Sequence, residues 1–144
     1  MLVQQILNSK PEQKAVTIAP DDTISEAAQL MSRHRIGAVV VSSDGETVEG
    51  VLSERDIVRE LARSGDSCLS GKVRDYMTRE VVTCAKGASA DELLTRMTEG
   101  RFRHLPVVED GKMIGVISIG DVVKAQLTQL EMEKGALEDM IKGF

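Results

Sequence analysis

Aromatic side chains are nearly absent from this chain of 144 residues, which has one tyrosine, two phenylalanines and no tryptophan. The hydrophobic core must therefore be aliphatic, built from Val, Ile, Leu, Met and Ala. Exposed nucleic-acid bases would find few rings on which to stack. The formal net charge of −5 also provides no basic field to attract a phosphate backbone. The composition thus disfavours a general nucleic-acid-binding protein.

Long apolar runs and metal-ligand cysteine spacings are missing as well. No segment approaches the roughly 18 consecutive apolar residues of a membrane span, and the N-terminus lacks the basic stretch and apolar run of a secretory signal. The two cysteines, Cys68 and Cys84, fit no metal-binding motif, and isolated thiols are typical of a reducing compartment. We therefore expect a cytoplasmic protein with no membrane association.

An internal repeat organises the chain. Residues 16–58 align with residues 82–123 at an offset of about 65 positions. In each half a short Val-Thr strand signal precedes a helical pattern, and within residues 24–31 the apolar side chains recur at i, i+3, i+4 and i+7. A β-branched, largely apolar run follows at residues 35–41 and 101–107 and is typical of a buried strand.

Both halves end on the same motif, Gly-h-h-Ser-x-x-Asp, in which h is apolar. It occupies residues 50–56 and 115–121, after an Asp-Gly turn in each half, and a helix is expected to begin there. The order of elements predicts an α/β (α+β) fold made of two β-α-β-β-α units. Because neither half is large enough to bury a good core alone, the units should pack together about a pseudo-twofold axis.

The Ser-x-x-Asp pairs, Ser53 with Asp56 and Ser118 with Asp121, have two interpretations. In the first they are capping boxes, in which the serine accepts from an amide of the first helical turn and the acidic side chain reaches back. In the second they bind a nucleotide. An ionised carboxylate can accept both hydroxyls of a ribose, while unpaired amides at a helix start favour a phosphate. The two roles do not exclude each other.

Basic side chains near the motifs also have two interpretations. Arg55 lies inside the first motif, and Arg101, Arg103 and His104 precede the core strand of the second half. Each alone is a candidate for an ordinary surface charge, but clustered guanidinium groups at a cleft are suited to bidentate phosphate binding. A catalytic base at His104 is disfavoured, because no nucleophile pattern accompanies it.

Together these features resemble the CBS-domain pair, named after cystathionine β-synthase. The resemblance covers about residues 11–126. Its markers are Val16-Thr17, Asp22-Thr23, the strand at residues 35–41, Met77-Thr78 and above all the doubled Gly-h-h-Ser-x-x-Asp. It implies two sheets that meet at a cleft with two related ligand sites. The implied domains are residues 11–70 and 77–126, followed by a C-terminal helical extension over residues 127–144.

The resemblance further implies that the motif's aspartate binds a ribose and that the base lies in an apolar slot. Because the halves cross, each site should combine one half's opening strand with the other half's Ser-x-x-Asp. The residues expected at the first slot are Val16, Ile36 and Gly37. Those expected at the second are Val82, Met77 and Phe102. The other expected ligand-binding residues are Thr17, Arg35, Ser53, Arg55, Asp56, Thr83, Arg103, His104, Ser118, Ile119, Gly120 and Asp121.

We expect the two sites to be unequal. Only the second half places Arg103 and His104 at the cleft, so the site that joins Asp121 with either of them should hold the more highly charged ligand or hold its ligand more tightly. In the second motif Gly120 takes the position that Arg55 has in the first. A side-chain phosphate contact is lost there, but a ligand can approach the backbone closely.

Both chain ends carry helical patterns. Residues 1–8 form a short amphipathic piece before Pro11, and the pattern after the second motif continues to about Lys142. This tail either folds back on its own subunit or forms a dimer contact, and CBS-domain pairs commonly associate as discs of two chains. Its apolar residues near a/d spacing are Leu127, Leu130, Leu137 and Ile141, with Lys134 at one seam position.

The resemblance implies a regulatory module that is not an enzyme. It would bind AMP, ADP, ATP or NAD(H), sense energy or redox state, and signal as a homodimer to a partner protein that the sequence does not name. Two alternatives are a ligand-free scaffold, in which the motifs are only helix caps, and a nucleotide hydrolase. Against the hydrolase, the chain has no phosphate-binding loop of the Gly-x-x-x-x-Gly-Lys-[Ser/Thr] kind and no metal-ligand cluster in its sequence.

Overall fold

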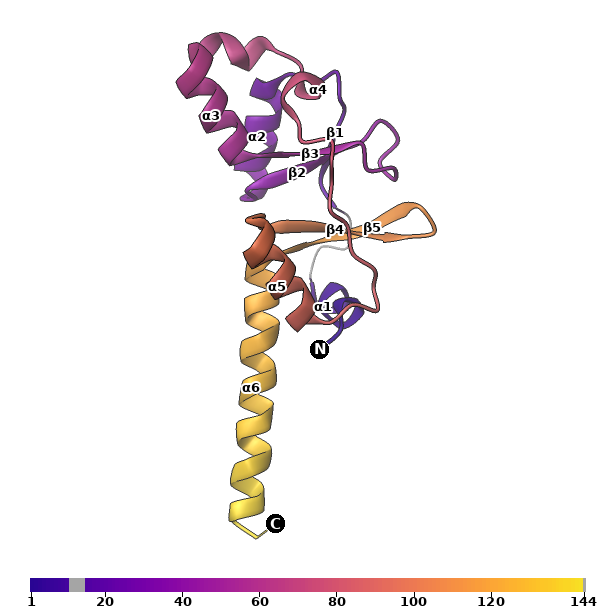
Figure 1. Ribbon diagram of the computed structural model, residues 1–144, viewed down its shortest axis with the longest axis vertical. Helices are drawn as coiled ribbons and strands as arrows, with labels where there is room; N and C mark the ends of the chain where they lie inside the picture. Colours follow the sequence, from indigo (N-terminus) through magenta and orange to yellow (C-terminus); the bar gives the residue numbers. More distant parts are fainter. Residues whose placement is uncertain (11–14, 144) are drawn as a thin grey trace.

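Two α/β halves lie one above the other in the computed structural model, which describes residues 1–10 and 15–143. Pro11, where the first domain is expected to begin, lies outside the described residues. Figure 1 shows the two small sheets facing each other across the middle, with the helices on the outer sides. One helix, at the C-terminal end, extends well beyond the rest of the molecule.

The first half is built on a three-stranded sheet of order β1-β2-β3. The central strand β2 is parallel to β1 and antiparallel to β3. Its main helix, α2, begins at a capping box between Thr23 and Glu26. The predicted apolar face of this helix is confirmed, since Ile24, Ala27 and Met31 are buried. The elements are β1 (Thr17–Ile18), α2 (Ile24–His34), β2 (Ala38–Val41), β3 (Gly50–Ser53) and α3 (Glu54–Ser64).

The second half repeats this order with one difference. Its elements are α5 (Ala90–Gly100), β4 (His104–Glu109), β5 (Lys112–Ser118) and α6 (Ile119–Ile141). The expected opening strand is reduced to a single parallel bridge between Cys84 and Val107, at the place where Ile18 pairs with Val41 in the first half. Pro106 has no N–H with which to extend this ladder, which explains the shortening.

The segments that lead into the two halves are exchanged. Helix α1 (Val3–Ser9) packs on the second half, where the Val3 amide donates to the Ala88 carbonyl at 2.8 Å. Helix α4 (Val73–Tyr76) packs on the first half, where Val73 donates to Asp22 at the same distance. A 3-10 helix, η1 (Gly65–Ser70), leads from α3 to α4.

The glycine that opens each repeated motif explains this docking. Leu7, at the end of α1, lies against Gly115, and Met77, after α4, lies against Gly50. A Cβ built on either glycine would come within 2.6 Å of that side chain, and a Cβ on Gly50 would also come within 2.9 Å of the Thr78 carbonyl oxygen. The backbone contact makes glycine necessary at position 50, while Leu7 could shift to admit a Cβ at position 115. Among the residues with described placement, no helix is both long enough and apolar enough to cross a membrane.

Candidate functional site

Two cavities open between the halves, and we call them cavity A, of about 590 Å³, and cavity B, of about 330 Å³. Both fall in the size range of small-molecule sites. Ala38, Val51 and His104 border both cavities and so form the wall between them. The strand registers place His104 beside Ser118 and Ala38 beside Ser53. Each serine motif therefore starts at the shared wall.

Cavity A joins the opening strand of the first half to the motif of the second. Val16 and Ile36 line it from one half, and Ser118 and Asp121 line it from the other. Lys10, the residue that follows α1, completes this end of the cavity. The crossed combination therefore has an apolar side next to a carboxylate and a helix start.

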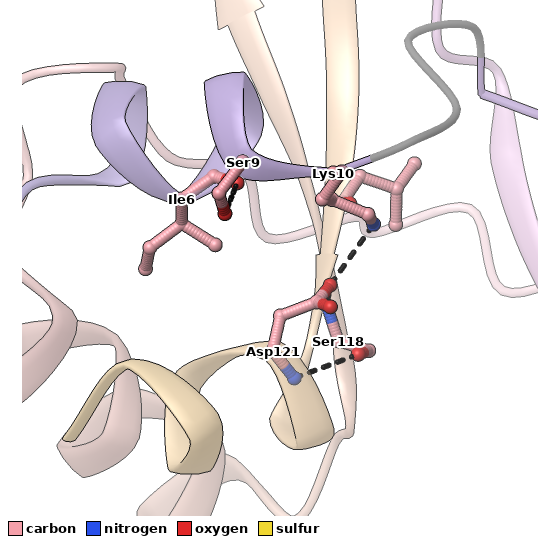
Figure 2. Close-up of polar contacts among 6 residues, drawn as sticks. Ile6, Ser9, Lys10, Ser118 and Asp121 are labelled. Carbon is pink, nitrogen blue, oxygen red and sulfur yellow. Dashed lines mark hydrogen bonds and ion pairs between the residues drawn. The ribbon is translucent and has the colours of Figure 1, made fainter. Parts of the chain in front are cut away.

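Asp121 is held at the rim of cavity A by a capping box and an ion pair, which Figure 2 shows. Its Oδ2 accepts from the Ser118 amide and from Lys10 Nζ, both at 2.9 Å. Lys10 Nζ also donates to the Val116 carbonyl at 2.8 Å. Burial alone would raise the pKa of the Asp121 carboxyl, but the hydrogen bonds from Ser118 and the Lys10 ammonium lower it overall. The aspartate is therefore ionised at neutral pH.

The position of Lys10 follows from the end of α1. Ser9 Oγ donates to the Ile6 carbonyl at 2.7 Å, which satisfies one of the last carbonyls of the helix. With α1 anchored on β5 through Leu7, the next side chain reaches the Asp121 carboxylate.

Cavity B joins the motif of the first half to apolar side chains of the second half, and the charged side chains that line it differ from those of cavity A. Ser53 and Asp56 line it from the first half and Val82 and Phe102 from the second. The carboxylate of Asp56 accepts from the Ser53 amide at 2.9 Å and pairs with Arg59 one turn along α3. The arginines that line cavity B are Arg55, Arg59, Arg101 and Arg103. Glu54 and Glu80 line it too, so four guanidinium groups face three carboxylates.

His104 lies between the cavities and is half-buried. Desolvation lowers the pKa of its imidazole and outweighs the attraction of Asp121 and Glu54 for the charged form. The imidazole is therefore neutral at pH 7, and a half-buried neutral ring beside two carboxylates is sensitive to acid.

This lowered pKa predicts a pH-dependent stability. The unfolded chain takes up a proton on this histidine at higher pH than the folded chain does, so the stabilisation is complete above the unfolded pKa near 6.5 and decreases as the pH falls. Thermal melts from pH 8 to pH 5 should show a smaller decrease of the melting temperature in His104→Gln than in the wild type. His34→Gln, at an exposed histidine, is the control. Equal slopes for all three proteins would contradict the assignment.

Two expected groupings are corrected by the structure. Gly37, expected beside Ile36 in the first slot, borders cavity B instead. Arg103, considered as a companion of Asp121, also borders cavity B and not cavity A. For Arg103 the reason is its place next to His104, the first residue of β4, because neighbouring side chains of extended chain point to opposite sides. His104 fulfils the other expectation and borders both cavities.

Six of the expected ligand-binding residues border neither cavity among the described residues. Arg35 ends α2 with a left-handed φ of 55°, Met77 packs against Gly50, and Ile119 joins the core of the second half. Thr83 lines a separate, open surface depression. The other two are Thr17 and Gly120.

Sequence reasoning missed several lining residues, with Lys10, Lys86 and Glu109 at cavity A and Glu54, Arg59 and Glu80 at cavity B. Arg59 could have been found, since it lies one helical turn after Asp56. Lys10 could not, because its contact with Asp121 depends on the exchange of α1 onto the second half.

Metal binding finds no support in the described residues, where no three His, Cys, Asp or Glu side chains gather around a point.

A model of the CBS domain family matches the chain twice, at residues 3–63 and 73–128. The CBS domain-containing protein CBSX3, mitochondrial, of Arabidopsis thaliana is 39% identical over 127 residues, which are 85% of this chain and 62% of that protein. This chain thus spans less than two thirds of that relative.

Solved structures agree with the fold. The CBS-domain containing protein ATU1752 from Agrobacterium tumefaciens superimposes with a TM-score of 0.84 at 44% identity, covering 88% of this chain and 99% of its own. Two more distant structures, both 25% identical, contain ligands. PAE2072 from Pyrobaculum aerophilum is complexed with AMP, with a TM-score of 0.73 over 84% of this chain and 89% of its own. The CBS domain pair of MJ0100 is complexed with 5′-methylthioadenosine and S-adenosyl-L-methionine, with a TM-score of 0.77 over 90% and 98%.

Proposed function

Because this chain belongs to the CBS domain family as a tandem pair, we propose that it is a regulatory module that binds an adenosine-containing ligand between its halves. The observation that supports this most is the crossed composition of the cavities. Each one brings a carboxylate at a helix start together with apolar side chains of the opposite half. The carboxylate suits a ribose, the amides at the helix start suit a phosphate, and the apolar side chains suit a base. Related pairs that contain AMP or S-adenosyl-L-methionine agree with this ligand class.

The two cavities differ in what they offer an adenosine ligand. Asp121 uses Oδ2 for the Ser118 amide and for Lys10, and no described residue donates to its Oδ1. Asp56 has both oxygens occupied, since Oδ1 pairs with Arg59 and Oδ2 accepts from Ser53. We therefore assign the ribose of a first ligand to Asp121 in cavity A.

The arginines give cavity B its preference for phosphate. One guanidinium group can bind two phosphate oxygens at once, and it keeps its charge at any physiological pH. Because Arg103 lines cavity B, we assign the more highly phosphorylated ligand, among AMP, ADP, ATP and NAD(H), to cavity B and not to the cavity of Asp121, where the sequence had led us to expect it. Occupancy of the two cavities would then report the energy or redox state of the cell to a partner protein.

Binding is tested by thermal denaturation of the full chain with AMP, ATP, NADH and S-adenosylmethionine. A ligand at 100 times its dissociation constant adds about 2.7 kcal/mol of stability, which raises the melting temperature of a chain of this size by roughly 5–10 °C. Guanosine and GMP serve as controls for recognition of the base. If none of the four adenosine compounds raises the melting temperature, the proposal is wrong and the ligand-free scaffold is the better interpretation.

A further inference from the structure

Helix α6 has two parts with different surroundings. Its first turns pack on the body of the molecule, where Val122 and Ala125 are buried and the Gln129 side chain accepts from the N-terminal ammonium at 3.0 Å. The C-terminal part of the helix extends away from the body (Figure 1), and every described residue from 130 to 143 except Gly135 is exposed. About three turns of helix thus stand without intramolecular packing.

Five exposed apolar side chains of α6, together with Lys134, form one continuous stripe along the helix. Their spacing alternates between four and three residues, which is the heptad pattern of a coiled-coil seam. At roughly 100° per residue, the stripe lies about a third of a turn from the side that Val122 and Ala125 turn to the body. A second helix can therefore lie along it without displacing the body. The seam consists of Val123, Leu127, Leu130, Lys134, Leu137 and Ile141.

Physical and comparative observations indicate that this stripe has a partner. A helix that contacts only water is marginal at this length, and the three seam leucines are each 57–59% exposed. The second match to the CBS domain family model ends at residue 128, so the projecting turns lie outside the region that defines the family.

We propose that α6 pairs with α6 of a second copy of this chain as an antiparallel two-stranded coiled coil. One register aligns all six seam positions. Val123 lies opposite the partner's Ile141, Leu127 opposite the partner's Leu137, and Leu130 opposite the partner's Lys134. The two bodies then lie at opposite ends of the coil.

The charges of α6 favour the antiparallel over the parallel direction. In a parallel pair Lys134 would face the partner's Lys134, and Glu133 would face the partner's Glu138. In the antiparallel register Lys134 packs on an apolar residue, and Lys124 faces the partner's Glu138 on both sides of the coil. Glu131 and Glu133 of both chains meet near the centre, where the two Lys134 ammonium groups offset part of their repulsion.

The pairing is tested on the full chain by sedimentation equilibrium at several concentrations. Leu130→Glu combined with Leu137→Glu places charges in the seam and should halve the molar mass of the assembly. Met132→Glu is the matched control, because this residue is 68% exposed on the same helix but off the seam. The proposal is overturned if the double variant keeps the wild-type mass, or if the wild type is monomeric at roughly 100 μM, where micromolar association would be nearly complete.

The direction is tested by exchanging charges. In the antiparallel register, Lys124→Glu and Glu138→Lys should each weaken association roughly two- to tenfold, and the double exchange should restore it. In a parallel coil, Glu138→Lys alone would face the partner's Glu133 and strengthen association. That second result would overturn the antiparallel register.

Discussion

Replacing Asp121 with alanine should lower the affinity of cavity A for an adenosine ligand by about 10- to 100-fold and so remove most of the corresponding thermal shift. The physical reason is the loss of charge-assisted hydrogen bonds to the ribose, each worth about 1.5–3 kcal/mol. Isothermal titration calorimetry with AMP measures the affinity directly. A full response from Asp121→Ala would refute the assignment of the ribose.

The control must separate binding from capping, since Asp121 also closes the start of α6. Ser118→Ala removes the cap and should cost about 1 kcal/mol of stability in the ligand-free protein, while the carboxylate remains in place. We expect Ser118→Ala to melt at a lower temperature but to keep most of its ligand-induced shift. Asp56→Ala provides the same comparison for cavity B.

Replacing Arg103 with alanine should weaken the binding of ATP at cavity B about tenfold or more and leave adenosine unaffected. Arg103 is an exposed residue beside a cavity that also contains Arg55 and Arg101, so its loss removes phosphate contacts without opening the core. Calorimetric titrations with ATP, AMP and adenosine measure the dependence on phosphate number. Arg33→Ala removes an exposed arginine that lines neither cavity and is the matched control. Equal losses for ATP and adenosine would exclude a phosphate role.

The fold was predictable because its signals are local and doubled. The apolar period of residues 24–31, the β-branched runs and the two Gly-h-h-Ser-x-x-Asp motifs each determine one element, and their repetition determines the architecture. The crossed composition of the cavities followed from the resemblance, and the structure places Val16 with Asp121 and Val82 with Asp56.

What the sequence did not reveal depends on contacts between distant segments. Arg103 and His104 are adjacent in sequence, and only the direction of each side chain decides that Arg103 belongs to cavity B while His104 separates the two. The ion pair of Lys10 with Asp121 spans 111 positions, and no local pattern encodes it. Pro106 shortened a strand that the Val-Thr signal alone had predicted.

The exchange of leading segments has a consequence for how the chain folds during synthesis. Helix α1 leaves the ribosome first, but its partners at Ala88 and Gly115 are made much later. The first half can form its sheet and bind α4 before the surface on which α1 docks has been synthesised. In a refolding experiment followed by hydrogen exchange, we expect the backbone amides of the N-terminal segment to become protected last. The reason is that the native contacts of this segment join residues that are far apart in the sequence. A cut between η1 and α4 would accordingly give two fragments, each lacking the helix that completes it.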